Sequence, residues 1–161
     1  MKRQMMLSAA IAGVLAMATV GVAIAQGRQP AQTGGSDVIH LVLPATGAHV
    51  QFLDFDHNGL GFADRLLTVG PIMNEAQSER VGTAYLDCWI GSKGYQDGSP
   101  LVCTQVLKLA DGNITTHGVD PHGLSDVFFS VTGGTGAYSG ASGQAEYIDT
   151  AQTDIIIDLD D

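Results

Sequence analysis

Basic residues are scarce in this chain, which has 7 Lys and Arg against 17 Asp and Glu and a formal net charge of −10. Nucleic acids and anionic membrane surfaces attract proteins through clustered positive charge. This charge balance therefore argues against nucleic acid or a membrane surface as a partner. Composition of this kind says nothing about the fold, which has to come from the pattern of residues.

Amphipathic helices are the second feature that the sequence lacks. From residue 37 onward, apolar residues recur at alternate positions, in short runs separated by turn clusters such as Gly94–Gly98 and Asp111–Asn113. Eight or nine short strands at this spacing are typical of an antiparallel barrel or sandwich. The predicted strands are 38–43, 48–54, 65–73, 81–91, 100–109, 113–119, 126–131, 143–149 and 153–159.

The first 36 residues have a different character. Lys2 and Arg3 precede an uncharged run over 4–27 that contains Ala23-Ile24-Ala25, a small-x-small cleavage site. This arrangement predicts a signal peptide over 1–25 in preference to a membrane anchor, a polar and flexible segment over 26–36, and one domain over 37–161. The mature chain, with a charge of about −12, is expected to be secreted to an extracellular or periplasmic space.

A strand runs into a glycine-rich turn near the end of the chain, and a second strand leaves it. The turn resembles the phosphate-binding loop of a dinucleotide fold, but Ser139 stands where a third glycine belongs, and the 21 residues after Gly140 alternate like strands. The dinucleotide interpretation is therefore disfavoured. The residues of this motif are Gly133, Gly134, Thr135, Gly136, Tyr138, Gly140 and Gly143.

This motif is similar to that of the allene oxide cyclase barrel-like and dirigent-like proteins, with Ser142 in place of the arginine usual before the last glycine. Asp64-Arg65 resembles the strand entry of the same family, and the similarity spans about residues 48–150. The resemblance implies a single antiparallel barrel of eight or nine strands that encloses an apolar cavity. Relatives form dimers or trimers, so a homo-oligomer is expected.

The resemblance leaves three functions open. The first is a cofactor-free, isomerase-like protein that steers the cyclisation or coupling of a hydrophobic small molecule. The second is a carrier that binds such a molecule without turnover, and the third is a structural barrel with a filled interior. A fold of this kind does not choose among them.

The candidate functional residues combine acids and aromatic rings on strands. The catalytic candidates are Tyr85, Asp87, Glu146 and Tyr147, and the ligand-pocket candidates are Tyr85, Trp89, Phe128 and Tyr147. The strand around Cys88 is apolar on one face and mixed on the other. The sequence leaves open which face points into the barrel.

The two cysteines are expected to form a disulfide, because exported proteins oxidise their thiols. In a symmetric hairpin around residues 94–98, Cys88 and Cys103 lie directly opposite each other.

Two clusters of possible metal ligands remain. Asp54, Asp56 and Asn58 match the first half of a calcium loop, but Arg65 stands where the closing glutamate of an EF-hand belongs. A polar hairpin loop is the favoured interpretation, with calcium affinity no better than about 0.1 to 1 mM. His117, Asp120 and His122 could in the same way bind zinc or copper, but turn residues are the favoured interpretation. His40, His49 and His57 have no neighbouring nucleophile that would indicate a catalytic triad.

Overall fold

The computed structural model describes residues 37–96, 98–122 and 126–160. The predicted signal peptide and the segment over 26–36 lie outside the described residues. No helix in the described part of the chain is long and apolar enough to cross a membrane.

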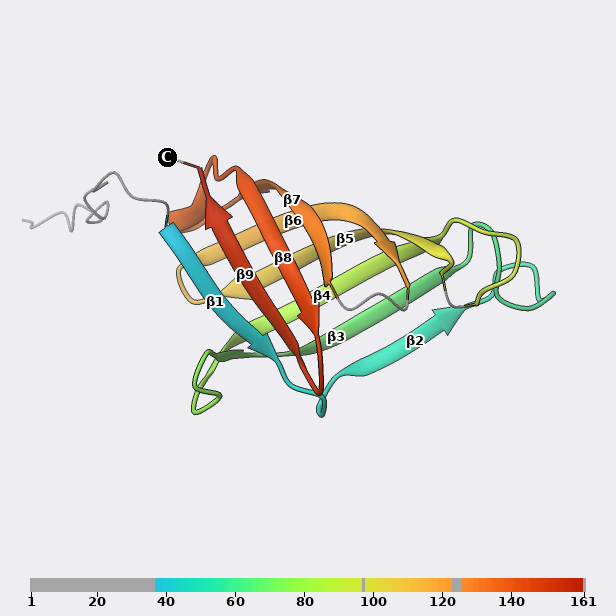
Figure 1. The fold of residues 1–161 in the computed structure, drawn as a ribbon, viewed down its shortest axis with the longest axis horizontal. Helices are drawn as coiled ribbons and strands as arrows, with labels where there is room; N and C mark the ends of the chain where they lie inside the picture. Colours follow the sequence, from blue (N-terminus) through green and yellow to red (C-terminus); the bar gives the residue numbers. More distant parts are fainter. Residues whose placement is uncertain (1–36, 97, 123–125, 161) are drawn as a thin grey trace, which may run out of the picture.

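The described chain is a succession of nine antiparallel strands (Figure 1). Each of the nine predicted segments overlaps one of them, so the all-β prediction is confirmed. A single turn of 3-10 helix, η1 (Gly136–Tyr138), lies within the glycine motif. The strands are β1 (Asp37–Leu43), β2 (His49–Leu53), β3 (Arg65–Asn74), β4 (Arg80–Ile90), β5 (Pro100–Leu109), β6 (Gly112–Pro121), β7 (Asp126–Gly134), β8 (Gly143–Asp149) and β9 (Thr153–Leu159).

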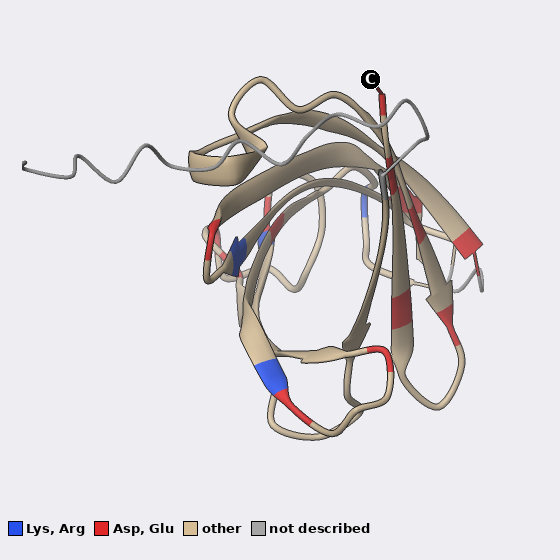
Figure 2. Cartoon of the chain, turned by 90° about the vertical axis from the view of Figure 1, so that its left-hand side faces the viewer, with Lys and Arg blue, Asp and Glu red and all other residues tan. Residues whose placement is uncertain are grey.

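Eight of these strands close into a barrel. The sheet order is β1-β9-β8-β7-β6-β5-β4-β3-β2, and β1 also pairs with β3 through Leu41↔Asn74 and Val42↔Met73. β3 is 10 residues long, so its first half can pair with β2 while its second half closes the barrel against β1. Seen along the barrel, the strands curve around a closed wall (Figure 2). β2 is therefore an additional strand at one end of the barrel.

Strict alternation along the strands decides which side chains point inward. β5 alternates exposed and buried positions from Pro100 to Gln105, and its inward residues include Leu101, Cys103 and Leu107. The apolar face that carries the cysteines is thus the inner face of the barrel. Cys88 and Cys103 are directly paired, with Cα atoms 4.0 Å apart, and form a disulfide as predicted.

The glycine motif allows close packing of the backbone between neighbouring strands. The backbone N–H of Thr135 donates to the carbonyl of Asn113 at the start of β6, and that of Ala137 donates to the carbonyl of Asp111 in the β5–β6 turn. Gly136 has a φ of 63°, and a Cβ there would lie 2.2 Å from the Asp111 carbonyl oxygen. A Cβ on Gly143 would lie 2.1 Å from the Asp158 carbonyl oxygen. Glycine is required at both positions because backbone approaches too closely for a side chain. The motif therefore joins neighbouring strands at one end of the barrel.

Candidate functional site

Three residues proposed from the sequence as pocket-lining lie on the outer surface of the barrel. Tyr85 and Trp89 alternate with the inward Cys88 and are 44% and 47% exposed. Phe128 alternates with the inward Phe129 and is 54% exposed. Since strand neighbours point to opposite faces, none of the three can line the interior. Glu146 pairs with Phe128 in the sheet and shares its outward face.

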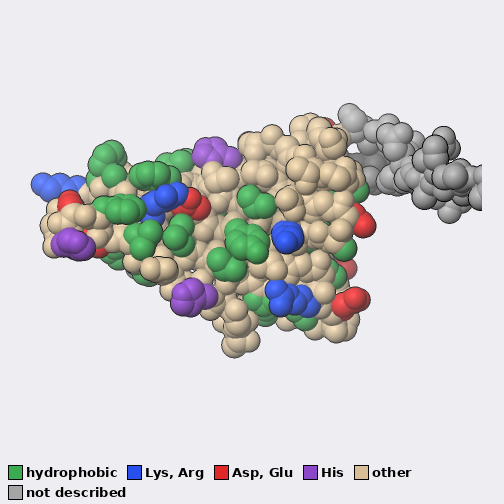
Figure 3. Space-filling model, turned by 180° about the vertical axis from the view of Figure 1, so that it is seen from behind, with side chains coloured by type: hydrophobic (Ala, Val, Ile, Leu, Met, Phe, Trp, Pro, Cys, Tyr) green, Lys and Arg blue, Asp and Glu red, His purple; other side chains and the backbone are tan. Residues whose placement is uncertain are grey.

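Asp87 also points outward, where it serves a surface ion pair. The Nε atom of Arg65 donates to Asp87 Oδ1 at 2.9 Å, and the same guanidinium makes a second contact with Oδ2. The guanidinium carbon lies 4.6 Å from the centre of the Trp89 ring, a cation–π contact. Hydrophobic side chains surround charged groups on this face of the molecule (Figure 3). The acid beside an aromatic ring that the sequence suggested is thus a feature of the outer wall.

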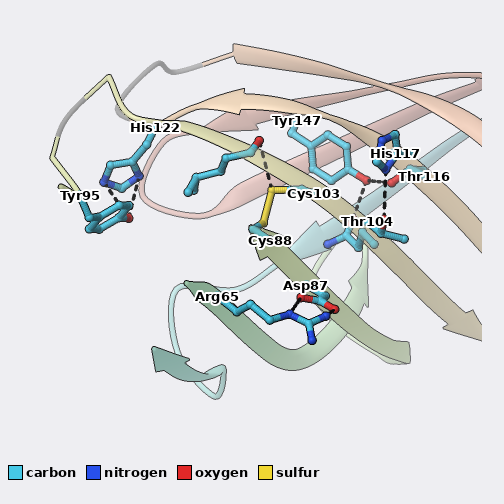
Figure 4. Close-up of a disulfide and its surroundings, with 12 residues drawn as sticks. Arg65, Asp87, Cys88, Tyr95, Cys103, Thr104, Thr116, His117, His122 and Tyr147 are labelled. Carbon is cyan, nitrogen blue, oxygen red and sulfur yellow. Dashed lines mark hydrogen bonds and ion pairs between the residues drawn. A yellow bond between two sulfur atoms is a disulfide. The ribbon is translucent and has the colours of Figure 1, made fainter. Parts of the chain in front are cut away.

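Tyr147 is the one candidate that lies inside the barrel. Its hydroxyl donates to Gln105 Oε1 at 2.5 Å and accepts from the Thr116 hydroxyl at 2.8 Å (Figure 4). The centre of its ring lies 4.9 Å from that of Phe129. We call Tyr147, Gln105 and Thr116 the interior polar trio. They come from β8, β5 and β6, and Tyr147 belongs to the same buried hydrophobic cluster as the disulfide and the aliphatic core residues.

The trio presents a protonated phenol to an apolar environment. Burial strongly raises the pKa of Tyr147, and the hydrogen bond with Thr116 offsets this only in part. The phenol therefore stays neutral across the physiological range. It can donate a hydrogen bond to a carbonyl, ether or hydroxyl oxygen, and it has no tendency to act as a base at neutral pH.

Gln105 and Thr116 were not identified from the sequence. They are 2% and 0% exposed. Gln105 follows Leu101 and Cys103 in the alternating pattern of β5, so a polar residue at an inward position was the available signal. Buried polar side chains need hydrogen-bonding partners. Two such residues on adjacent strands could have indicated a shared partner.

A group of aromatic rings lies at the end of the barrel beside β2. Tyr95, in the β4–β5 loop, has its ring centre 5.6 Å from that of Phe52 and 4.9 Å from that of His122. The Tyr95 hydroxyl lies 3.1 Å from His122 Nε2. Phe52 comes from β2, the strand outside the closed barrel. The rings therefore link the additional strand to two loops at this end, which we call the aromatic end.

Asp120 adds an acid to the aromatic end. The register of the sheet pairs it with the buried Leu101, on the inward face of β6. Burial raises the pKa of this carboxyl, the negative charge of Asp149 raises it further, and His122 lowers it. Asp120 thus holds its proton to higher pH than a free aspartate does. An acid at this position can exchange a proton or accept a hydrogen bond from a ligand.

The structure brings together the ligands of one of the two possible metal sites and not those of the other. His117 points outward and hydrogen-bonds Thr104 at 3.1 Å, while His122 contacts Tyr95. Within the described ranges the two histidines and Asp120 do not form a group of metal ligands. Asp54 and Asp56 are brought together with Asp64, which was not identified as a ligand from the sequence.

Comparisons with known proteins rest on the fold. No protein-family model matches the chain, and no curated protein does. A solved pyocyanin demethylase superimposes with a TM-score of 0.65 and 21% identity, over 76% of this chain and 99% of that chain. The pterocarpan synthase dirigent protein PsPTS1 superimposes with a TM-score of 0.55 and 19% identity, over 78% of this chain and 92% of that chain. AbnU, an exo-specific intermolecular Diels-Alderase, superimposes with a TM-score of 0.56 and 17% identity, over 78% of this chain and 98% of that chain.

These identities are low enough that the likeness concerns the fold alone. It agrees with the resemblance carried by the glycine motif, which packs two strands of the barrel against each other. The chain therefore has the antiparallel barrel fold of the dirigent proteins and of the Diels-Alderase cyclases.

Proposed function

We propose that this protein binds a hydrophobic small molecule inside its barrel and holds it in one reactive conformation, so that the molecule cyclises or couples in a defined way. The observation that carries this proposal is the interior polar trio. A protonated phenol surrounded by aliphatic side chains suits a ligand that is mostly apolar and has one hydrogen-bond acceptor.

The residues of the barrel can assist such a reaction without a cofactor. Apolar walls exclude water and restrict the conformations of a bound molecule, which lowers the entropic part of the barrier. The Tyr147 hydroxyl can exchange its bond with Gln105 for one to a ligand oxygen. A donor in such a dry site stabilises negative charge that develops on that oxygen during reaction.

The aromatic end is the proposed entrance. Phe52, Tyr95 and His122 offer flat apolar faces, and Asp120 adds a protonatable carboxyl. The solved proteins with this fold include a demethylase, a dirigent protein and a Diels-Alderase. Their chemistry differs, but each acts on an organic small molecule. This common feature supports a small-molecule ligand for the present chain and leaves its identity open.

Export of the mature chain belongs to the same proposal. The disulfide between Cys88 and Cys103 and the leader-like sequence before residue 26 support it. Mass spectrometry of the N-terminus of the protein recovered outside the cytoplasm tests it. A mature N-terminus at Gln26 is expected, and full-length protein retained with the cells would contradict it.

The proposed function is tested with Nile red, an uncharged fluorescent probe that has an apolar ring system and a carbonyl acceptor. The protein is expected to bind it with saturation and with a blue shift of the emission. Tyr147→Phe removes the proposed donor, and one hydrogen bond is worth about 1 kcal/mol, or about fivefold in affinity. Tyr85→Phe makes the same chemical change on the outer wall and is the matched control.

A fivefold weaker affinity in Tyr147→Phe, with Tyr85→Phe unchanged, supports an interior site. Equal loss in both variants, or loss in Tyr85→Phe alone, places the binding on the outside of the barrel. Absence of binding in a folded protein favours the structural alternative. In that case the exposed side chains of Tyr85, Trp89 and Phe128 become the candidate surface for self-association, which light scattering measures.

A further inference from the structure

The loop between β2 and β3 holds three acids close together. Carboxylate oxygens of Asp54, Asp56 and Asp64 all lie within 4.8 Å of one another. Like charges at this separation repel each other and favour either protonation or a bound cation. Clusters of exposed acids are common, so the argument depends on what surrounds these oxygens.

One oxygen of the cluster is buried without a partner. Asp54 Oδ1 exposes less than 1 Å² and has no hydrogen-bond donor among the described residues. The other oxygen, Oδ2, accepts the backbone N–H of Gly59 at 2.9 Å. Burying a charged oxygen without a partner is costly. A cation that coordinates Oδ1 removes that cost.

Asp64 is fixed as a second buried carboxylate. It is 3% exposed. Its Oδ1 accepts the N–H of Phe55 at 2.9 Å, and its Oδ2 accepts the N–H of Gly61 at 2.8 Å. Each carboxylate oxygen has two acceptor sites, so each keeps one for an ion. The loop backbone thus holds this carboxylate in place before any ion arrives.

The electrostatics of the loop agree with cation binding. Arg65, which the EF-hand template places at the closing position, has its guanidinium engaged with Asp87 on the outer wall. The positive charge expected to repel an ion is thereby neutralised by another acid.

We propose that the 54–64 loop binds one calcium ion through the carboxylates of Asp54, Asp56 and Asp64. Carboxylate oxygens in an irregular arrangement suit calcium, because calcium accepts about 6 to 8 oxygen ligands in a flexible geometry. Magnesium requires a near-octahedral site. Asn58 stands beside them, with its amide nitrogen 2.6 Å from Asp56 Oδ2. The loop joins two strands and closes with Asp64, so it is not an EF-hand.

The ion would stabilise the aromatic end. The Leu60 carbonyl accepts the N–H of Tyr95 at 2.9 Å, and the Ile90 N–H donates to the Asp64 carbonyl at 2.9 Å. An ion that orders the loop therefore also orders the segment that carries Tyr95. This role is structural and does not require the proposed ligand-binding function.

Calorimetric titration of CaCl2 into protein freed of metal by chelation tests the proposal. A dissociation constant of about 0.1 to 1 mM is expected, with weaker binding of MgCl2. Asp54→Asn and Asp56→Asn should each weaken calcium binding at least about tenfold, because each removes one charged ligand. Glu79→Gln removes one exposed charge from the β3–β4 turn, at the opposite end of the molecule (Figure 1), and should leave the affinity unchanged.

Asp64→Asn is not used as the main test, because its side chain also holds the loop. Circular dichroism confirms that the other variants are folded, and calcium should raise the thermal midpoint of the wild type and of Glu79→Gln by more than that of either Asp variant. No binding to the folded wild type up to about 10 mM calcium overturns the proposal. It is equally overturned if Asp54→Asn and Asp56→Asn bind as the wild type does.

Discussion

Replacing Tyr147 with phenylalanine should cost far more stability than the loss of one hydroxyl suggests. The change keeps the ring and its contact with Phe129 but removes the group that Gln105 and Thr116 both bond. Both partners are buried. Leaving a buried polar group without a partner costs about 1 to 3 kcal/mol. With two such groups, the free energy of unfolding should fall by about 2 to 6 kcal/mol.

A triple variant separates the effect of unpaired polar groups on stability from the effect of side-chain packing. Tyr147→Phe combined with Gln105→Met and Thr116→Val removes every member of the trio and leaves no orphaned partner. Apolar groups of similar shape replace such a network with little loss. The triple variant should therefore recover at least half of the stability that Tyr147→Phe alone loses.

Urea denaturation followed by far-ultraviolet circular dichroism measures these differences. Tyr85→Phe, on the outer wall, is the control and should change the unfolding free energy by less than about 0.5 kcal/mol. If Tyr147→Phe is as mild as this control, the trio is not an interdependent network. If the triple variant loses the sum of the three separate losses, the same reasoning fails.

Three other changes have defined outcomes. Cys88→Ala should lower the unfolding free energy by about 3 kcal/mol through loss of the bond to Cys103, measured against the wild type with and without reductant; equal stability would contradict this. Gly136→Ala should lower the thermal midpoint more than Gly140→Ala, because both have positive φ but only a Cβ at Gly136 meets backbone within 2.2 Å; equal effects would refute the packing role of the motif. The raised pKa of Asp120 means that ionising this carboxyl destabilises the folded state. The unfolding free energy of Asp120→Asn should therefore increase relative to that of the wild type as pH rises from below about 3.8 toward 7. A difference that stays constant with pH would be inconsistent with the raised pKa.

The strands and the disulfide were predictable because their signals are local. Alternation of apolar residues marks a strand regardless of its partners. The pairing of Cys88 with Cys103 follows from the symmetry of one hairpin. The closed topology came from the family resemblance that the glycine motif carries, since the spacing of the strands alone fits a barrel or a sandwich. Each of these inferences depends on residues that are near in sequence.

The interior site was harder to predict, because it depends on contacts between distant strands. Both faces of β4 carry apolar residues, so the sequence could not orient Tyr85 and Trp89, which face outward. Tyr147 meets Gln105 across 42 positions in the chain. Neither residue belongs to a motif, and their partnership exists only once the barrel has closed.

Asp64 illustrates the same difficulty on a smaller scale. It lies only 10 residues from Asp54, but the calcium-loop template looks for a ligand one position later, at Arg65. Turns with positive φ at His57 and Ala63 shorten the path of the loop and bring Asp64 back to the first acids. Spacing rules taken from helix-flanked loops do not anticipate this geometry.

The central claim is that a hydrophobic molecule binds inside the barrel, and methyl NMR during a Nile red titration tests it most directly. Interior methyl groups should shift and saturate together, including those of Leu107, Ile155 and Ile157, while those of the exposed Val102 and Val119 stay in place. Shifts confined to Val102 and Val119 would place the ligand on the outer wall. Such a result, or no shift at all in the folded protein, would contradict the proposed function.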